Sequence, residues 1–422
     1  MARKKQSEKT ASTDNTIDLG KDIGLTVYGD VKHSAILNRL PTGFPHLDYI
    51  LGGGLPFGRM VEVLGKNASG KSTFAIILTA MAQTLNVPVV WVDVEGTADP
   101  ERLAQLGINF QAGGVYMVEP DVKKNTSTGL MEKVPMTVEI VAEKLTQVIG
   151  AFSVTKKPLL VIWDSVAQTP TATELERGVG DKQPGIKAKA LSQFSAQIAP
   201  LMTNSQTLFV AINQARDEMG SMFGGIDSPG GHALHHWASL RLEVQQASQI
   251  KEKTLDAFGS EEVSYVGHIM RIKTEKSKVS RPKQKAEIYL ISDKGLSLEE
   301  NVYRACLATN KQYGFISGGA WKKYKALDGT EHQFNSDKNW VEYLSSEAGR
   351  PILEELFGRM MAVTFPEGYA PYSNQDVDIR QHPIYKAVEN YQKLYGTPST
   401  EASSEPLEAD IDESVQGLLD NI

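Results

Sequence analysis

Residues 60–73, MVEVLGKNASGKST, decide how the rest of the chain is interpreted. The apolar run 60–64 predicts a buried strand, and the apolar residues 74–78 that follow predict the opening of a helix. Between them, residues 65–72 match G-x-x-x-x-G-K-[ST] at every fixed position. This order of strand, glycine loop and helix favours a phosphate-binding loop over an ordinary glycine turn.

The loop has the chemistry that a nucleotide phosphate requires. Glycines let the backbone wrap around a phosphate, and exposed N–H groups at a helix N-terminus attract its oxygens. Lys71 adds a full positive charge, and Ser72 offers a hydroxyl to Mg²⁺. The predicted nucleotide-binding residues of this loop are Gly65, Lys66, Asn67, Ala68, Ser69, Gly70, Lys71, Ser72 and Thr73.

Composition describes an ordinary globular protein with room for two or three domains. The 422 residues are 41% hydrophobic and 23% charged, and no apolar run reaches the length of a membrane span. The single cysteine, Cys306, excludes an intrachain disulfide and fits a reducing compartment. We therefore expect a cytoplasmic protein without a membrane partner.

The net charge of −7 is concentrated at the C-terminus. Residues 396–422 contain seven acids and no Lys or Arg, so residues 1–395 are formally neutral. A neutral body with an acidic tail is compatible with a DNA-binding protein whose tail competes for the same basic surface. A disordered tail that only improves solubility is the alternative.

Apolar runs alternate with helical patterns along the first 300 residues. This alternation predicts an α/β fold with a mostly parallel sheet covered by helices on both faces. The predicted strands after the first are residues 88–95, 158–163, 207–212, 238–244, 266–273 and 285–291, and the predicted helices include residues 138–149 and 186–202.

Three of these strands end in polar residues, and ligands of such sheets lie at the carboxyl ends of the strands. Asp164 follows LLVIW and is the expected Mg²⁺ acid beside Ser72. Glu95 is placed to orient and deprotonate a water, with helix capping as its alternative role. Gln214 is a candidate contact to the γ-phosphate, or else a plain loop glutamine.

Two glycine-containing loops follow the third and fourth strands, at residues 176–185 and 216–231. Basic residues flank them, and the second loop carries apolar side chains that would be costly to leave uncovered. Basic residues interleaved with apolar ones suit a nucleic-acid backbone with splayed bases. A substrate lid or a subunit contact is the alternative.

Taken together, these segments resemble the bacterial RecA recombinase family over roughly residues 37–345. The resemblance is carried, in order, by LPTGFPHLDYILGGGLPFGRMVEVLG, DVEGTADPERLAQLG, ELERGVGDKQPGIKAKALSQ, INQARDEMGSMFG, GGHALHHWASLRLEV and KSKVSRPKQKAEIYL. It implies a RecA-like P-loop NTPase core, a small α/β C-terminal domain and an acidic tail.

The resemblance also implies roles for individual residues. Glu95, Lys71 and Gln214 would act at ATP, together with Lys276 and Lys278 delivered from a neighbouring subunit. Asp99 and Arg102 would lie at the nucleotide, although Arg102 replaces an aromatic residue that usually stacks on adenine. The DNA-binding residues implied by the match are Lys187, Lys189, Ser192, Arg216, Met219, Phe223, Gly230, Gly231 and His232.

The function that this resemblance implies is a DNA-dependent ATPase that uses ATP and Mg²⁺. It would form helical filaments on single-stranded DNA and catalyse pairing and strand exchange with homologous double-stranded DNA, in recombination, DNA repair and the SOS response. The alternatives are a hexameric RecA-type helicase or branch-migration ATPase, an ATP-gated recombination mediator without turnover, and a small-molecule kinase.

The expected organisation has five parts. Residues 1–36 form an N-terminal arm, and residues 37–298 form the ATPase core with two DNA-binding loops. Residues 299–365 form a small C-terminal domain, residues 366–396 an extension with one amphipathic helix, and residues 397–422 an acidic disordered tail.

Overall fold

The computed structural model describes residues 39–96, 100–109, 114–124, 129–155, 157–176, 185–217, 226–227, 233–255, 261–291 and 295–364. The predictions for the N-terminal arm, for the extension with its amphipathic helix and for the acidic tail lie outside these residues.

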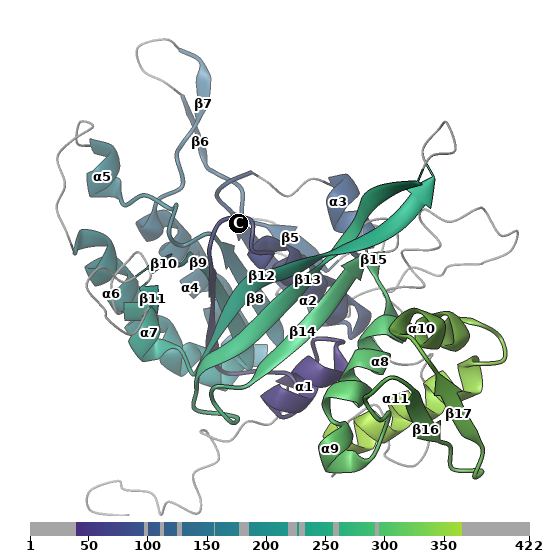
Figure 1. The fold of residues 1–422 in the computed structure, drawn as a ribbon. Coiled ribbons are helices and arrows are strands. Elements are labelled where there is room, and N and C mark those ends of the chain that lie inside the picture. The colour runs from purple at the N-terminus through teal and green to yellow at the C-terminus, as the bar shows by residue number, and fades with distance from the viewer. Residues whose placement is uncertain are drawn as a thin grey trace, which may run out of the picture. The chain divides into compact units, whose positions relative to one another are not determined.

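Nine strands of the described residues form one sheet in the order β15-β14-β13-β12-β3-β9-β8-β4-β5 (Figure 1). The strands from β12 to β5 run parallel to one another, whereas β13, β14 and β15 are added antiparallel at one side. Their bounds are β3 Met60–Gly65, β4 Val89–Asp93, β5 Val115–Met117, β8 Leu159–Asp164, β9 Thr207–Gln214, β12 Leu240–Leu255, β13 Glu261–Ser277, β14 Lys285–Ile291 and β15 Gly295–Leu296. The predicted mostly parallel α/β sheet is confirmed.

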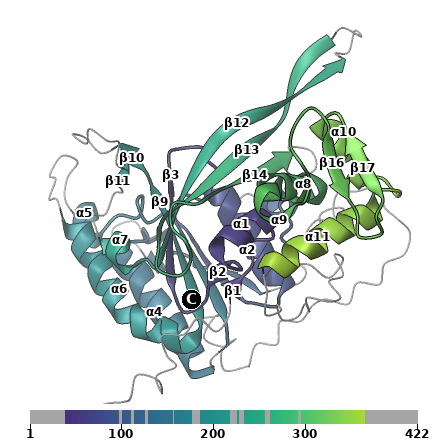
Figure 2. The same ribbon diagram turned by 60° about the horizontal axis from the view of Figure 1, so that its bottom comes forward.

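Helices cover both faces of this sheet, because both faces of its central strands are apolar. Along β8, Leu160 and Ile162 belong to one hydrophobic cluster, and Leu159, Val161 and Trp163 belong to the other. Figure 2 shows α1 and α2 on the first face and α4, α6 and α7 on the second. The bounds are α1 Pro45–Leu51, α2 Lys71–Thr84, α3 Pro100–Gln105, α4 Val138–Thr155, α5 Ala172–Glu176, α6 Ile186–Ser205 and α7 Ala233–Trp237.

Strands β12 and β13 are much longer than the sequence predicts. The expected strands covered residues 238–244 and 266–273, whereas the two strands pair with each other from Leu240↔Ser277 out to Leu255↔Glu261. The added part has polar residues at most positions, so it lacks the apolar alternation that identifies a half-buried strand. Its backbone groups are satisfied by mutual pairing, and both views show the ribbon extending beyond the sheet (Figures 1 and 2).

Before β12, three short strand pairs of the described residues form separate two-stranded sheets outside the central sheet. They are β1 Arg39–Leu40 with β2 Leu55–Pro56, β6 Val122–Lys124 with β7 Met131–Lys133, and β10 Arg216–Asp217 with β11 Ile226–Asp227. None of these pairs was predicted, because runs of two or three residues carry no usable periodicity. Among the described helices, none combines the length and the apolar surface that crossing a bilayer requires.

The elements after β15 pack on the α1 side of the core (Figure 2). They are α8 Leu298–Ala308, α9 Asn310–Tyr313, β16 Lys322–Lys325, β17 Glu331–Phe334, α10 Asp337–Ser345 and α11 Arg350–Thr364. The buried side chains of these elements belong to the same hydrophobic cluster as those of α1 and α2, and a separate domain at residues 299–365 stays a prediction.

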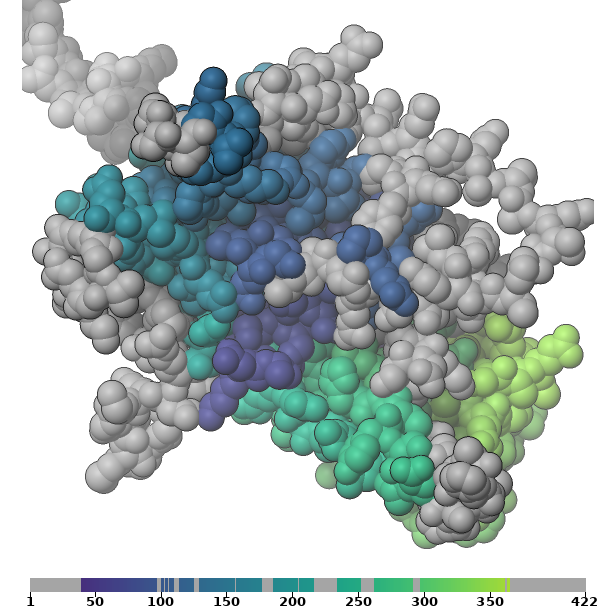
Figure 3. All heavy atoms as spheres, turned by 90° about the horizontal axis from the view of Figure 1, so that it is seen from above, coloured from purple at the N-terminus to yellow at the C-terminus, as the bar shows by residue number. Residues whose placement is uncertain are grey.

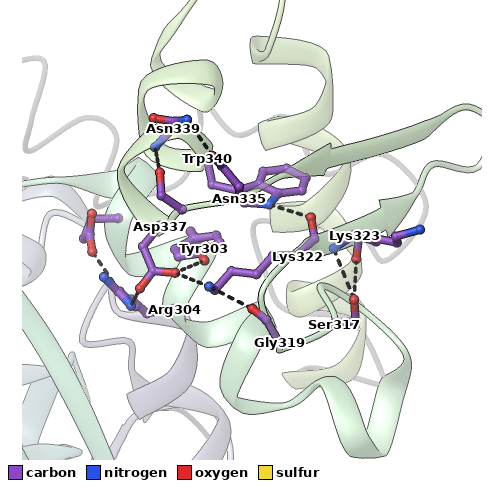
Figure 4. Close-up of polar contacts among 12 residues, drawn as sticks. Tyr303, Arg304, Ser317, Gly319, Lys322, Lys323, Asn335, Asp337, Asn339 and Trp340 are labelled. Atoms are coloured by element: carbon purple, nitrogen blue, oxygen red, sulfur yellow. Dashed lines mark hydrogen bonds and ion pairs between the residues drawn. The ribbon is translucent and has the colours of Figure 1, made fainter.

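A polar network centred on Asp337 joins three of these C-terminal elements (Figure 4). The Asp337 carboxylate accepts hydrogen bonds from Tyr303 Oη and Arg304 Nη1, both at 2.6 Å, and forms an ion pair with Lys322 Nζ at 3.1 Å. Trp340 Nε1 donates to the Lys322 carbonyl at 3.0 Å. The Asp337 carboxylate, at the start of α10, thus links that helix to α8 and to β16.

Candidate nucleotide site and nucleic-acid interface

Strands β12 and β13 pack closely against the glycine loop between β3 and α2. A Cβ atom on Gly65 would lie 2.3 Å from the carbonyl oxygen of Val244, and one on Gly70 would lie 2.8 Å from Met270 Sδ. Gly70 also has a φ of +99°, in the left-handed region that side chains disfavour. The β12 backbone therefore requires glycine at position 65, and the left-handed backbone conformation favours glycine at position 70.

The interior of the loop presents groups that fit a bound phosphate. Ser69 Oγ is buried and has no hydrogen-bond partner within the described residues. Lys71 Nζ donates to the Lys66 carbonyl oxygen at 2.9 Å, and burial lowers the pKa of this lysine, while the nearby Asp164 and Glu95 act to raise it. An unsatisfied hydroxyl, a lysine and the free N–H groups at the start of a 14-residue helix together suit a phosphate anion.

Asp164, at the carboxyl end of β8, lies beside the phosphate loop. The Ser72 hydroxyl donates a hydrogen bond to its carboxylate, so the two predicted magnesium ligands are brought together. Burial raises the pKa of Asp164 to about 6; the Ser72 bond and Lys71 oppose this shift, and Glu95 and Asp93 add to it. This concentration of negative charge fits a divalent cation, because Mg²⁺ prefers hard oxygen ligands.

Glu95 is held close to Asp164 by the pairing of two neighbouring strands. Asp93 of β4 lies opposite Asp164 of β8, and Glu95 follows two residues later. Ser165 Oγ donates to Glu95 Oε1 at 3.0 Å, and the Gly96 amide donates to Asp93 Oδ1 at 2.9 Å. Figure 3, which views the molecule from above relative to Figure 1, shows the purple segments in the middle, with teal to their left and green below them.

Gln214 lies next to the phosphate loop, because it pairs with Gly65 in the parallel ladder between β9 and β3. The residue before it belongs to a buried polar group. Asn213 Nδ2 donates to Glu62 Oε1 at 3.0 Å, and Arg241 Nε donates to Glu62 Oε2 at 2.5 Å. Three adjacent strands, β9, β3 and β12, are thereby joined inside the sheet, and Asn213 anchors the residue directly before Gln214.

Comparison with known proteins identifies the family of this chain. Residues 11–297 match the family model described as the RecA N-terminal domain. The chain belongs to the RecA family. A protein named Protein RecA from Streptomyces ambofaciens is 33% identical over 323 residues, which cover 75% of this chain and 77% of that protein. Protein RecA of Mycobacterium ulcerans is 33% identical over 337 residues, which cover 79% of this chain and 87% of that protein.

For most of the residues that the resemblance implies in DNA binding, the structure describes no side chain. The positions outside the described residues, or described only in their backbone, are Arg216, Met219, Phe223, Gly230, Gly231 and His232, and at the nucleotide Asp99 and the side chain of Arg102. Lys189 and Ser192 lie exposed on α6. Their roles stay predictions.

Lys187, also expected to bind DNA, is engaged within the protein. Its ammonium group donates to the Ala167 carbonyl oxygen at 3.0 Å and lies 3.7 Å from the Glu174 carboxylate. Its side chain is 18% exposed. In this arrangement Lys187 ties α6 to the segment after β8, and a DNA contact would require it to leave these partners.

Lys276 and Lys278 lie away from the phosphate loop of their own chain. Lys276 pairs with Arg241, which pairs with Glu62, so it is level with the middle of β3 and about 10 Å short of the loop along the strand direction. Lys276 Nζ donates to the His235 carbonyl oxygen at the end of α7, and Lys278 Nζ lies 3.5 Å from the carbonyl oxygen of the next residue. Both lysines are therefore gathered at one helix end.

Two features of the site were not predicted. Ser165, which bonds Glu95, gave no signal beyond its position directly after a strand-end acid. Glu62 did give one, since a carboxylate inside the apolar run MVEVLG must find a partner when it is fully buried. That partner, Arg241, is 179 residues away in sequence, so only the fold identifies it.

Proposed function

We propose that this chain is a DNA-dependent ATPase that forms filaments on single-stranded DNA and catalyses homologous pairing and strand exchange. Membership in the RecA family assigns it to recombination and DNA repair. The observation that carries the ATPase part is the phosphate loop with Ser72, Asp164 and Glu95 gathered at the carboxyl edge of the sheet. The family match does not favour the helicase, mediator and kinase alternatives.

The loop amides and Lys71 would bind the phosphates of ATP, since they combine N–H donors with a positive charge. Ser72 and Asp164 would hold Mg²⁺, which would offset negative charge on the phosphates when bound. Glu95 would take a proton from the attacking water, and the Ser165 hydroxyl would keep its carboxylate oriented toward the site.

Gln214 would report the γ-phosphate to the loop that follows β9. Its position beside Gly65 supports this role, and the buried Glu62–Asn213–Arg241 group would limit how the strand end can move. Loops 176–185 and 216–231 would then form the surface for single-stranded DNA, with a homologous duplex as the second partner. Binding of ATP and binding of DNA would thus shift the same filament-assembly equilibrium.

Lys276 and Lys278 would act on the ATP of a neighbouring subunit in the filament. Their distance from the loop of their own chain supports this division, because an intrachain role would need them at the carboxyl edge. Positive charge delivered across an interface would stabilise the transferring phosphate and make hydrolysis depend on assembly.

A strand-exchange assay tests the proposed activity. With ATP and Mg²⁺, the protein is expected to transfer one strand of a linear duplex to a homologous single-stranded circle, and to fail with a non-homologous circle. Unwinding of a forked duplex without any homologous partner would instead identify a RecA-type motor and contradict the proposal.

The pKa of Asp164 gives this site a predicted pH dependence. Near or below pH 6 the free carboxyl carries a proton, which must leave before the carboxylate can bind Mg²⁺. We therefore expect the affinity for Mg²⁺–nucleotide to fall as pH drops below about 6, by as much as about tenfold per pH unit, and to be level above about 7.

Titration of a fluorescent ATP analogue, with Mg²⁺ and with a chelator, measures this dependence. Without Mg²⁺ the nucleotide affinity should lose most of its pH dependence in this range. Asp164→Asn should bind Mg²⁺–nucleotide weakly with a flat profile, and a wild-type profile in this variant would exclude Asp164 as the titrating group.

A further inference from the structure

The hairpin β6–β7 exposes apolar side chains, and among the residues that the structure describes no third strand pairs with it. All six residues of its two strands are exposed, and Val122, Leu130 and Met131 are 52%, 67% and 65% exposed. An isolated two-stranded hairpin is marginally stable in water, and it gains nothing in the free protein from presenting large apolar side chains to solvent. The exposure of these side chains therefore indicates a surface that binds a ligand.

The root of the hairpin is firmly attached to α4. Lys144 Nζ, on a side chain only 14% exposed, donates to the Glu119 carbonyl oxygen at 3.1 Å and pairs with Asp121 Oδ1 at 3.0 Å. The Val134 amide donates to the Asp121 carbonyl oxygen at 2.7 Å and closes the ladder. The hairpin is thus presented at a defined place on the molecule.

The two faces of the hairpin differ in chemistry. Val122 pairs with Lys133 and Lys124 pairs with Met131, so these four side chains share one face, which we call the Val122 face. The remaining pair, Lys123 with Glu132, lies on the opposite face and balances its own charge. The Val122 face therefore combines two lysines with two exposed apolar side chains.

Two nearby acids do not cancel this positive charge. Asp121 is already paired with Lys144 at the root. Glu119 lies 3.9 Å from Lys133, but both side chains are about 70% exposed, and an exposed pair at that distance is strongly screened. The face remains complementary to an anionic ligand that also offers apolar surface.

The start of α4, which follows the hairpin in the chain, contacts the segment that leads into the first proposed DNA loop. The Val138 amide, just after the hairpin, donates to the Pro170 carbonyl oxygen at 2.8 Å, and the Ala172 amide at the start of α5 donates to Glu139 Oε2 at 2.9 Å. Strand β5 runs parallel to β4, so the hairpin leaves the sheet at the carboxyl edge, as α5 does (Figure 1).

We propose that the Val122 face is an additional binding surface for single-stranded DNA. Lys124 and Lys133 contact phosphates, while Val122 and Met131 pack against exposed bases. A duplex fits less well, because its stacked bases offer no free apolar faces. This inference rests on the proposed function and adds a contact outside the two glycine-containing loops.

Two kinds of variant separate the phosphate contacts from the base contacts. Lys124→Gln with Lys133→Gln should lower the slope of log affinity against log salt by about 1.4, since each phosphate contact to a single strand contributes about 0.7. Val122→Ser with Met131→Ser should weaken binding by about threefold or more at an unchanged slope. The matched control, Lys123→Gln with Lys338→Gln, removes the same charge from the other face and from exposed α10, and should keep the wild-type slope.

The measurement is the fluorescence anisotropy of a labelled oligo-dT with a non-hydrolysable ATP analogue, over a salt titration. DNA-free ATP hydrolysis should be unchanged in all variants and verifies their folding. A wild-type slope in the Lys124/Lys133 variant overturns the hairpin contact, whereas absent DNA binding by the wild type overturns the proposed function itself. Changed sedimentation of the DNA-free protein with an unchanged slope would mean that the face contacts a second copy, which also overturns the proposal.

Discussion

Replacing Lys71 with alanine is expected to lower ATP hydrolysis by about 100- to 1000-fold, the cost of removing one preorganised group from a developing negative charge. Lys71 is the first residue of α2, and its pKa responds to Asp164 and Glu95, so it lies within the charged cluster of the site. Strand exchange supported by ATP should be lost with hydrolysis. Initial rates of phosphate release with saturating single-stranded DNA measure the effect.

The matched control is Lys66→Ala, which removes the same charge from an exposed position of the same loop. The Lys66 carbonyl oxygen, which accepts the Lys71 bond, is kept in this variant. Hydrolysis should therefore fall by less than about tenfold, a loss typical of a peripheral charge. A Lys71→Ala protein that still exchanged strands with ATP would refute the proposed site.

Replacing Glu95 with glutamine is expected to lower ATP turnover by about 100- to 10,000-fold while nucleotide and DNA binding are retained, because general-base catalysis contributes within this range. Glutamine keeps the size of the side chain and can still accept the bond from Ser165 Oγ, but it cannot take a proton from water. Single-turnover hydrolysis and equilibrium nucleotide binding should be measured together.

Ser165→Ala tests whether the hydroxyl orients Glu95. It should lower turnover by about five- to tenfold, the cost of one typical intramolecular hydrogen bond, and leave ATP affinity unchanged. Glu95→Gln should erase any further effect of Ser165→Ala, because both act through one carboxylate. Near-normal turnover in Glu95→Gln would exclude Glu95 as the base.

The central sheet could be predicted because its strands are apolar on both faces. Strands β8 and β9 each appear in the sequence as an apolar run that ends in a polar residue, and β3 is apolar except for Glu62. The ribbon β12–β13 could not be predicted at its full length, because its outer part is stabilised by mutual pairing and not by burial. The hairpin β6–β7 was missed for the same reason.

The site was predictable in its residue types but not in its geometry. The motif indicated Lys71 and Ser72, and the strand ends indicated Asp164 and Glu95. The bond from Ser165 to Glu95 depends on the register Asp93↔Asp164, which no local pattern specifies. Likewise, only the pairing of β12 with β3 and β13 shows that Lys276 lies away from the phosphate loop of its own chain.

The most direct test of the account is ATP hydrolysis with and without single-stranded DNA, measured over a salt titration. We predict strong stimulation by DNA that fades as salt rises, because Lys and Arg contacts to phosphates release counterions on binding. The account would be contradicted if single-stranded DNA left the rate of ATP hydrolysis unchanged at every salt concentration, both in the full chain and after removal of residues 397–422.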